Sequence, residues 1–477
     1  MENSSQSSLS FWKSFLVLPV VVILILCAIV GGFASTLLWP TNDDKISKAK
    51  HQVVLAKYDP NAKVSALTPE QKEGMGDTSD AANDPAANYK AVLGLLKKNY
   101  YGTAINEKKS KQLTYSAIRG MLGSLRDQFT SFLDPEEWSQ MLIQTRGDFE
   151  GIGALLQKDG VDIKVARPIE GSPAEKIGIK ADDIIVSVDN KSVKGKELND
   201  VVKLIKGKSG TKVEIGVIRA RTSLTFPIIR ARVEPPIVQH WMEDDKNKIG
   251  HIVLSEFNEK SIPQMEVAYQ DLVHRGMKAL VFDLRYNPGG LLEVAINVAS
   301  EFIPADENKE LKNVVVYIRE GSGREQARLL QPSEYTHKPI PMVVLVNEHS
   351  ASASEIVSGA IKDYGIGTLI GDRTFGKGKV QTLFPLEDNS ALRLTTALYF
   401  PPKKNDINFK HDEDGNRIEG TGGITPDIYV KQSPKWKMED FKDKVNDTQL
   451  QKALDFLRAK LNGLTTAQAT DLVKKSP

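Results

Sequence analysis

The alternation of strand-like and helix-like segments between residues 236 and 432 most constrains how this chain can fold. Four short apolar runs have the length of buried strands, and longer stretches between them carry apolar residues at helical spacing. Such alternation predicts an α/β layer with largely parallel strand pairing. The predicted strands are Ile249–Leu254, Ala279–Leu284, Val314–Ile318 and Met342–Val346, and the predicted helices are Ile262–His274, Leu291–Phe302 and Ala353–Tyr364.

The rest of the chain divides into segments of different composition. Residues 147–235 carry short apolar runs punctuated by Gly, Asp and Asn, which predicts a small β-rich domain before the α/β region 236–435. Residues 87–146 and the charged tail 436–477 are predicted to be helical. Residues 39–86 are rich in Asp, Asn, Ala, Lys and Pro, so we expect a flexible linker that buries no core.

An apolar segment without charged residues runs from Phe15 to Leu38 and exceeds the ~20 residues that span a bilayer as a helix. Lys13 precedes it, and this positive flank predicts that residues 1–14 stay in the cytoplasm. We expect a single-pass anchor at residues 15–38 in the cell membrane, with the bulk of the chain on the periplasmic or extracellular side. A cleaved signal peptide is the alternative, although no clear Ala-x-Ala site is present.

Charge and cysteine content exclude several function classes. Lys and Arg number 63 against 61 Asp and Glu, and this balance gives no support for nucleic-acid binding. The single cysteine, Cys27, excludes an intramolecular disulfide and Cys-cluster metal sites. Leu26 before it is not the small residue expected at a lipid-attachment site. The sequence also lacks His-Glu-x-x-His spacing, so we expect neither a metal nor another cofactor.

The strongest chemical signal is the serine–alanine alternation Ser350–Glu355, which follows the predicted strand Met342–Val346. The chain should turn there from strand to helix, at the strand end where α/β proteins place their chemistry. The next backbone N–H would then lie at a helix amino terminus, where it can hold an oxyanion. The alternative is structural, with the serines as helix caps and Ser352 and Glu355 as a capping box.

Lys377 lies between two glycines, and Gln381 follows it by four residues. A lysine acts as a general base only when burial or a nearby positive charge favours its neutral form, whereas an ordinary lysine such as Lys379 is solvated. Residues 371–377 also match the start of a phosphate-binding loop. However, Gly378 stands where Ser or Thr should reach magnesium, and a strand-like run follows where that loop needs a helix.

Two further features leave alternatives open. Gly289 and Gly290, after a predicted strand, could expose backbone amides to a ligand, or they could simply form a good turn. A Ser-His-Asp triad of distant residues is possible, although His349 lies only three residues before Ser352 and no Gly-x-Ser-x-Gly elbow occurs.

Several of these motifs together resemble the C-terminal processing (tail-specific) peptidases, which are serine endopeptidases with a PDZ domain. The matching blocks are Asp283–Gly290, Ser350–Ile356 and Thr374–Gln381. Their order agrees with that family, and so does the separation of 25 residues from Ser352 to Lys377. Upstream, Gly147–Gly153 and Gly171–Ala174 are similar to the PDZ domain that these enzymes insert before the peptidase core.

The resemblance implies a role for each residue of the peptidase site. Ser352 would be the nucleophile, Lys377 its general base, and Gln381 the residue that orients the lysine amine. The backbone amide of Ala353 would form the oxyanion hole together with an amide of the Pro-Gly-Gly turn. The resemblance leaves open whether Gly289 or Gly290 supplies that second amide.

The resemblance also implies a fold and a mode of substrate capture. The fold would be a crotonase- or ClpP-like α/β core with an inserted PDZ β-domain, a helical N-terminal segment and an N-terminal transmembrane helix. Amides around Gly151, Ile152 and Gly153 would capture a substrate's terminal carboxylate while its tail adds as an edge strand. The sequence departs from the family at His349, where relatives often have a small or basic residue, and at Asp182, where glycine is usual.

The leading hypothesis is a membrane-anchored serine endopeptidase that acts outside the cytoplasm on proteins with exposed C-terminal tails. The helical segments at both ends suggest a homodimer. A scaffold that tethers tails beside a silent core is the alternative class, and the presence of Ser352, Lys377 and Gln381 argues against it. A nucleotide-binding enzyme would need the incomplete phosphate-binding loop.

Overall fold

The computed structural model describes residues 84–305, 310–332, 337–412, 416–436 and 441–475. Within these, residues 84–132 and residues 133–475 form two compact units. The predicted cytoplasmic segment 1–14, the anchor 15–38 and most of the linker 39–86 lie outside the described residues. Among the helices that are described, none combines the length and apolarity needed to cross a bilayer.

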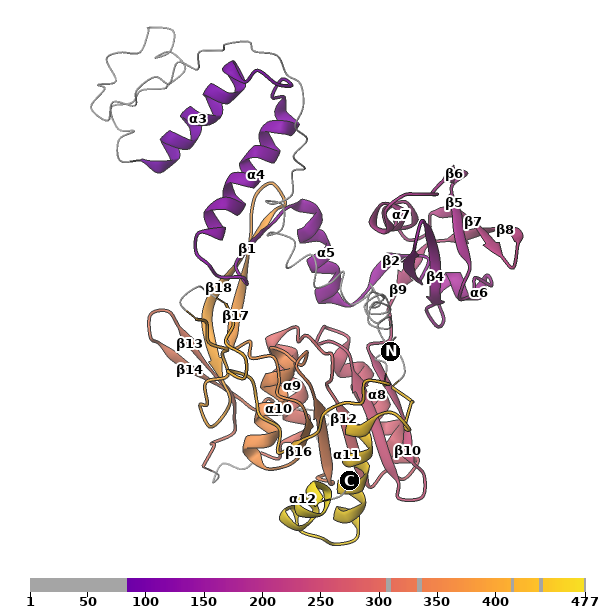
Figure 1. Ribbon diagram of the computed structural model, residues 1–477, viewed down its shortest axis with the longest axis vertical. Helices are drawn as coiled ribbons and strands as arrows, with labels where there is room; N and C mark the ends of the chain where they lie inside the picture. Colours follow the sequence, from indigo (N-terminus) through magenta and orange to yellow (C-terminus); the bar gives the residue numbers. More distant parts are fainter. Residues whose placement is uncertain (1–83, 306–309, 333–336, 413–415, 437–440, 476–477) are drawn as a thin grey trace, which may run out of the picture. The chain divides into compact units, whose positions relative to one another are not determined.

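The smaller unit contains two helices, α3 (Pro85–Asn99) and α4 (Glu107–Gly123), as the helical spacing predicts (Figure 1). Each begins at a capping side chain: Asp84 accepts from the Ala86 N–H, and Asn106 accepts from the Lys109 N–H. The Tyr89 hydroxyl donates to Thr114 Oγ1 at 2.6 Å and joins the two helices. Strand β1 (Ser131–Leu133) and helix α5 (Pro135–Arg146) follow.

The predicted β-rich segment forms a sheet in the order β3-β4-β5-β7-β8, with β6 beside β5. Its core is a separate apolar cluster that includes Val165, Val201 and Ile215. Asp182 adopts φ 66°, a left-handed turn that Asp tolerates better than most residues, so it can replace the usual glycine. The elements are β2 (Phe149–Gly151), β3 (Ala154–Asp159), β4 (Asp162–Pro168), α6 (Pro173–Lys176), β5 (Ile184–Val188), β6 (Lys191–Ser192), α7 (Leu198–Ile205), β7 (Lys212–Arg219), β8 (Thr222–Ile229) and β9 (Ala231–Val233), of which β2 pairs with β9.

The α/β region is built on a six-stranded sheet in the order β10-β11-β12-β15-β16-β19. All its neighbours pair in parallel except β10 with β11, so the predicted parallel layer is confirmed. The carboxyl ends of β12 and β15 therefore lie side by side at one edge. The strands are β10 (Val238–Asp244), β11 (Ile249–Leu254), β12 (Ala279–Asp283), β15 (Met342–Val346), β16 (Thr368–Gly371) and β19 (Ile428–Tyr429).

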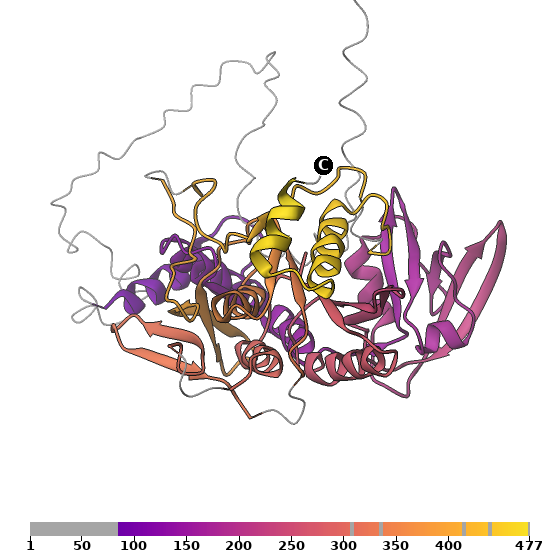
Figure 2. The same cartoon turned by 90° about the horizontal axis from the view of Figure 1, so that it is seen from below.

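Helices cover both faces of this sheet, which is why its strands are apolar at successive positions. Helices α8 (Ser261–His274), α9 (Leu292–Phe302) and α10 (Ala353–Tyr364) pack on one face, against side chains such as Val344. Helix α11 (Thr448–Leu461) packs on the other face against Val343 and its neighbours, with α12 (Thr466–Lys475) beside it. Figure 2 shows the yellow α11 and α12 on the opposite side of the sheet from α8, α9 and α10.

One predicted strand belongs elsewhere. The run predicted as Val314–Ile318 is β13 (Val314–Glu320), and it lies in a second, antiparallel sheet instead of the parallel layer. Its neighbours there are β14 (Glu325–Leu329) on one side and β18 (Ala391–Phe400) on the other, and β18 also pairs with β17 (Lys379–Pro385). Apolar content alone predicted the strand correctly, but it does not identify the partner strand.

Candidate active site

Ser352 lies where β15 hands over to α10, at the carboxyl edge of the parallel sheet. It is the residue immediately before the helix, and its backbone adopts φ 55° and ψ −112°, an uncommon conformation for a residue other than glycine. The side chain is half-buried. A serine held in such a strained turn presents its hydroxyl at a fixed place above the strand ends.

The two neighbouring serines of the motif have structural partners. Ser350 is fully buried, and its hydroxyl donates to the Leu284 carbonyl at 2.8 Å and accepts from the Asn347 N–H at 2.9 Å. Ser354 is also fully buried and donates to the Asn287 carbonyl at 2.9 Å. Burial therefore separates the three serines, and only the middle one is accessible.

The carboxylate of Glu355 connects the serine turn (residues 347–352, between β15 and α10) to the lysine loop (residues 372–378, between β16 and β17). Its Oε2 accepts from the backbone N–H groups of Ser352 and Lys377, each at 2.9 Å. Its Oε1 accepts from the Gly376 N–H at 2.7 Å and from the Thr374 hydroxyl at 2.6 Å. Burial raises the pKa of Glu355, and these hydrogen bonds offset the increase only in part.

This carboxylate also explains the partial match to a phosphate-binding loop. Two amides of the loop, at Gly376 and Lys377, point at an anion, but the anion is the chain's own Glu355. A strand, β17, follows the loop in place of the helix that a nucleotide site requires. The structural reading of Glu355 as part of a capping box is correct for its bond to the Ser352 N–H, and its contacts extend further.

Tyr399, on β18, forms a second connection between the same two residues. Its side chain is 1% exposed, and its hydroxyl lies 2.9 Å from the Ser352 carbonyl and within hydrogen-bonding distance of the Lys377 carbonyl. Burial raises the pKa of Tyr399 well above its ordinary value, and the nearby Glu355 adds to the increase. The hydroxyl therefore stays protonated and remains a hydrogen-bond donor.

The Pro-Gly-Gly turn packs directly against the serine. A Cβ atom on Gly289 would lie 2.7 Å from Ser352 Cβ and 2.9 Å from the Ala353 nitrogen, so this approach requires glycine. Asn287 fixes the turn: its carbonyl accepts from the Ala351 N–H at 3.0 Å, and its Oδ1 accepts from the Gly289 N–H at 2.9 Å.

Two backbone amides beside Ser352 remain available. Among the described residues, the N–H groups of Ala353 and Gly290 have no hydrogen-bond acceptor, whereas the Gly289 N–H is taken by Asn287. Ala353 is the first residue of α10, so its N–H lies at the positive end of the helix. This arrangement favours Gly290 over Gly289 as the second donor to an oxyanion.

The remaining predicted residues of the peptidase site make different contacts. Gln381 lies on β17 beside an irregularity in the pairing with β18, and its amide nitrogen donates to the Lys379 carbonyl at 3.2 Å. Its role in orienting the lysine amine stays a prediction. His349 is half-exposed and stacks on Tyr286, with ring centroids 5.0 Å apart.

The predicted carboxylate loop of the β-rich domain lies before its edge strand β3. Gly153 has φ 77° and its carbonyl accepts from the buried Ser172 hydroxyl at 2.8 Å, while the Ile152 carbonyl accepts from the Ala174 N–H at 2.8 Å. For the N–H groups of Ile152 and Gly153, the described part of the chain supplies no acceptor. Gly151 pairs with Ala231 in the short β2–β9 ribbon.

A buried charged network anchors the start of the Pro-Gly-Gly loop. Arg285 is 1% exposed and contacts both Asp283 at 2.6 Å and Asp447 at 2.8 Å, the latter contributed by the C-terminal segment. His251 lies between Asp283 and Glu243. Burial lowers the pKa of His251, but its hydrogen bonds to the two carboxylates outweigh this effect, so the net pKa is raised.

Comparisons with known proteins agree with this geometry. Residues 248–430 match the model of peptidase family S41, and residues 164–219 match that of the PDZ domain. A probable CtpA-like serine protease of Staphylococcus epidermidis is 34% identical over 78% of this chain and 70% of its own length. The chain belongs to peptidase family S41.

Other relatives of this S41 peptidase carry similar descriptions. A probable CtpA-like serine protease of Staphylococcus aureus is 35% identical over 76% of this chain and 68% of its own length. Among solved structures, a photosystem II D1 C-terminal processing protease is 29% identical, covers 76% of this chain and 94% of its own, and has a TM-score of 0.40. The predicted enzyme class, a serine peptidase with a PDZ domain, is confirmed.

Sequence reasoning missed two parts of this S41 site. The sequence indicates Glu355 only as a helix cap, because its bonds to the lysine loop join residues that are distant in sequence. Tyr399 gave no signal at all, because an aromatic residue within an apolar strand is usually a core residue. Its role becomes visible only in the structure, where β18 bonds to the lysine loop and the Tyr399 hydroxyl contacts the carbonyls of both Ser352 and Lys377.

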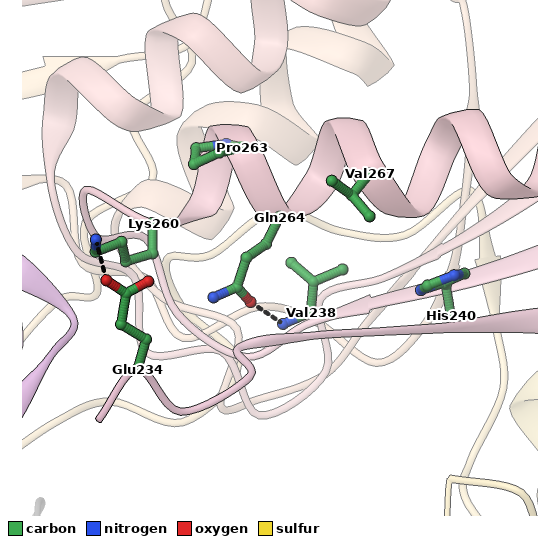
Figure 3. A pocket seen from close by; sticks show the side chains of 7 residues that line it. All are labelled: Glu234, Val238, His240, Lys260, Pro263, Gln264 and Val267. Atoms are coloured by element: carbon green, nitrogen blue, oxygen red, sulfur yellow. Dashed lines mark hydrogen bonds and ion pairs between the residues drawn. The ribbon is translucent and has the colours of Figure 1, made fainter. Parts of the chain in front are cut away.

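A groove of about 450 Å³ lies elsewhere on the S41 domain, between β10 and α8 (Figure 3). Lys260 pairs with Glu234 at 2.7 Å, and Gln264 Oε1 accepts from the N–H groups of Ile237 and Val238 at 2.9 and 3.2 Å. Gln264 therefore satisfies donors at the free edge of β10. The residues that line this groove include none of the predicted site residues.

Proposed function

We propose that this S41 peptidase hydrolyses peptide bonds with a Ser352/Lys377 dyad, through an acyl-enzyme. The supporting observation is that one buried carboxylate, Glu355, accepts from the backbone N–H groups of both residues at 2.9 Å. That connection fixes the serine turn and the lysine loop to each other, as a nucleophile and its base require. Gln381 would orient the lysine amine.

The proposed roles imply the following reaction. Lys377 Nζ, in its neutral form, accepts the Ser352 hydroxyl proton as Oγ attacks the scissile carbonyl carbon. The N–H groups of Ala353 and Gly290, with Gly289 bringing the turn into contact, stabilise the oxyanion. Lys377 then protonates the leaving amine. It next takes a proton from the water that attacks the ester, and it returns this proton to Ser352 Oγ as the acyl C–O bond breaks.

Catalysis is tested with purified protein and a substrate that carries an unstructured apolar C-terminal tail. Ser352→Ala and Lys377→Ala should each abolish cleavage, while the matched control Lys379→Ala, two residues further on, should retain it. Because Lys379 lies on β17 beside the same loop, it controls for loss of charge at this surface. Unchanged turnover in Ser352→Ala would refute the dyad, whereas a wild type that binds tail peptides without any cleavage would favour the scaffold.

We also propose that the PDZ domain captures the substrate's C-terminus at Gly151, Ile152 and Gly153. The support is a loop with free N–H groups at Ile152 and Gly153 beside the edge strand β3, which a tail can extend as an added strand. Amidating the substrate's C-terminus should slow cleavage because it removes the carboxylate. Equal rates for the acid and the amide would show that this loop does not bind the terminus.

The membrane anchor at residues 15–38 is proposed from the sequence alone. It would hold the enzyme in the cell membrane by a single pass, with the catalytic domain on the periplasmic or extracellular side. Full-length protein should then stay with membranes after carbonate extraction, and its peptidase domain should be digested by a protease added from outside the cytoplasm. Release by carbonate would contradict the anchor and favour a cleaved leader.

A homodimer is proposed from the apolar surface of the smaller unit. Helix α3 has no buried residue, and Tyr89, Val92 and Leu96 share one face, with Val92 56% exposed. A second copy of the same face would cover these side chains. Light scattering should give a dimer mass for the wild type and a monomer mass for Val92→Glu. A monomeric wild type would exclude this interface.

A further inference from the structure

A segment that follows β18 wraps the lysine loop from its outer side. We call residues 405–412 and 416–424 the strap. The Phe409 N–H donates to the Gly376 carbonyl at 3.1 Å, and Asn408 Oδ1 accepts from the Gly378 N–H at 3.1 Å. The strap therefore bonds to the residue on each side of Lys377.

The strap explains why the lysine is flanked by glycines. Gly376 has φ 92°, and a Cβ on it would lie 2.9 Å from the Gly423 nitrogen and 3.1 Å from the Ile407 carbonyl oxygen. A Cβ on Gly378 would lie 2.7 Å from the Asn408 side chain. Both glycines thus allow the backbone of the loop to contact the strap directly, Gly376 against the strap's backbone and Gly378 against the Asn408 side chain.

Arg417 closes this contact from the solvent side. Its guanidinium lies 4.9 Å from the ring centroid of Phe375 and 4.7 Å from that of Phe409, and the two rings meet edge to face at 5.7 Å. Arg417 Nη2 also donates to the Phe375 carbonyl at 2.6 Å. One exposed arginine therefore joins the strap to the residue two positions before Lys377.

We propose that Arg417 is a positioning residue: it locks the strap onto Phe375 and so sets the place of Lys377 relative to Ser352. The inference rests on the proposed role of Lys377 as general base. The inner side of the loop is held by Glu355 and Tyr399, and the strap holds its outer side. A displacement of ~1 Å at a reacting group can cost about 100-fold in rate. The surface contact of Arg417 with Phe375 and the strap, which we call the latch, can therefore control the chemical step.

The test compares Arg417→Ala, Arg417→Lys and a control, Lys410→Ala, in otherwise intact protein. Lys410 is an exposed cation on the same strap, and its backbone N–H bonds to Thr421 whatever its side chain is. Arg417→Ala should lower kcat on a tail peptide about 10-fold with KM within about twofold. Arg417→Lys should recover part of this loss, because lysine keeps the charge but not the planar stack. Lys410→Ala should match the wild type.

The pH dependence separates positioning from general damage. A loosened loop admits water to the lysine amine, and water favours the protonated form, so the rise of kcat should move to higher pH in Arg417→Ala. Wild-type kcat in Arg417→Ala, or a loss with an unshifted pH profile, would overturn the inference. If Lys377→Ala stays active, the proposed dyad fails; if Lys377→Ala is inactive while Arg417→Ala is normal, only the latch fails.

Discussion

Ser352 and Lys377 donate their backbone N–H groups to the same oxygen atom, Oε2 of Glu355, each at 2.9 Å. Replacement of Glu355 by Gln removes one acceptor oxygen and places an NH₂ group among four donors. Because the NH₂ group would repel the donors that face it and leave them without an acceptor, we expect the serine turn and the lysine loop to separate. Glu355→Gln should lower kcat about 100-fold, with KM changed by only a few fold, in a tail-peptide cleavage assay.

Glu348→Gln is the matched control for this change. The Glu348 side chain is 59% exposed and four residues before Ser352, so its loss of charge should leave kcat within about twofold. Activity of Glu355→Gln within threefold of the wild type would show that the shared carboxylate does not align the two residues.

The hydroxyl of Tyr399 gives a second prediction. Tyr399→Phe keeps the ring in the core but deletes the group that contacts both the Ser352 and Lys377 carbonyls. We expect kcat to fall about 10-fold, while stability falls by ~1 kcal/mol, the usual net value of one hydrogen bond. Steady-state kinetics and thermal unfolding of the same preparation measure the two effects.

Tyr364→Phe deletes a comparable bond away from the site, because the Tyr364 hydroxyl donates to the Val314 carbonyl at 3.1 Å. It should lose similar stability and keep its activity. Equal activity losses in the two variants would mean that Tyr399 acts only through stability.

Local pattern predicted the elements that carry the site. The bounds of β11, β15 and α10 agree with the prediction residue for residue. The two strands are short apolar runs. Helix α10 has a clear signal at each end, because Ser352 and Glu355 cap its start and Gly365 ends it. The strand β13 was predicted too, but in the wrong sheet. Strand propensity reflects a half-buried pleated surface and contains no information on which strand becomes the neighbour.

The contacts that complete the site could not be predicted in the same way. Tyr399 and the strap meet the lysine loop only through long-range pairing, and Asp447 reaches Arg285 from the C-terminal segment. The irregular pairing beside Gln381 has no sequence signature, although it decides where that side chain points. The resemblance supplied the roles of single residues; the geometry supplies what connects them.

The pair formed by Asp447 and Arg285 predicts how the C-terminal segment supports the sheet. Both side chains are fully buried, and Arg285 also contacts Asp283, so Asp447→Asn leaves part of a buried positive charge uncompensated. We expect a loss of ~3 kcal/mol, which lowers the thermal midpoint by roughly 5 °C or more. Scanning calorimetry measures this change.

Asp455→Asn is the control, since Asp455 lies on α11, the helix that Asp447 caps, and its ion pair with Arg458 is about half exposed. Its midpoint should change by less than about 2 °C, because exposed pairs contribute little. A midpoint for Asp447→Asn that equals this control would mean that the buried pair does not anchor the segment.

The buried Glu301 predicts a stability change on the alkaline side. Its side chain is 1% exposed, and burial, together with the charge of Glu266, raises its pKa to about 8. The folded state therefore holds a proton that the unfolded state releases near pH 4.5. The contribution of Glu301 to the free energy of unfolding consequently falls as pH rises from about 4.5 to about 8, and it is constant above that. Glu301→Gln cannot ionise and should lack this loss.

The measurement is the stability difference between Glu301→Gln and the wild type across pH 5 to 9, from chemical unfolding. The free energy of unfolding of the variant should rise steadily relative to that of the wild type up to about pH 8. The total rise should reach up to several kcal/mol, because each pKa unit corresponds to ~1.4 kcal/mol. Glu310→Gln, which changes an exposed glutamate of the same domain, serves as the control. A constant difference between Glu301→Gln and the wild type would show that Glu301 is already ionised in the folded enzyme, with Glu266 and His337 rearranged to accept its charge.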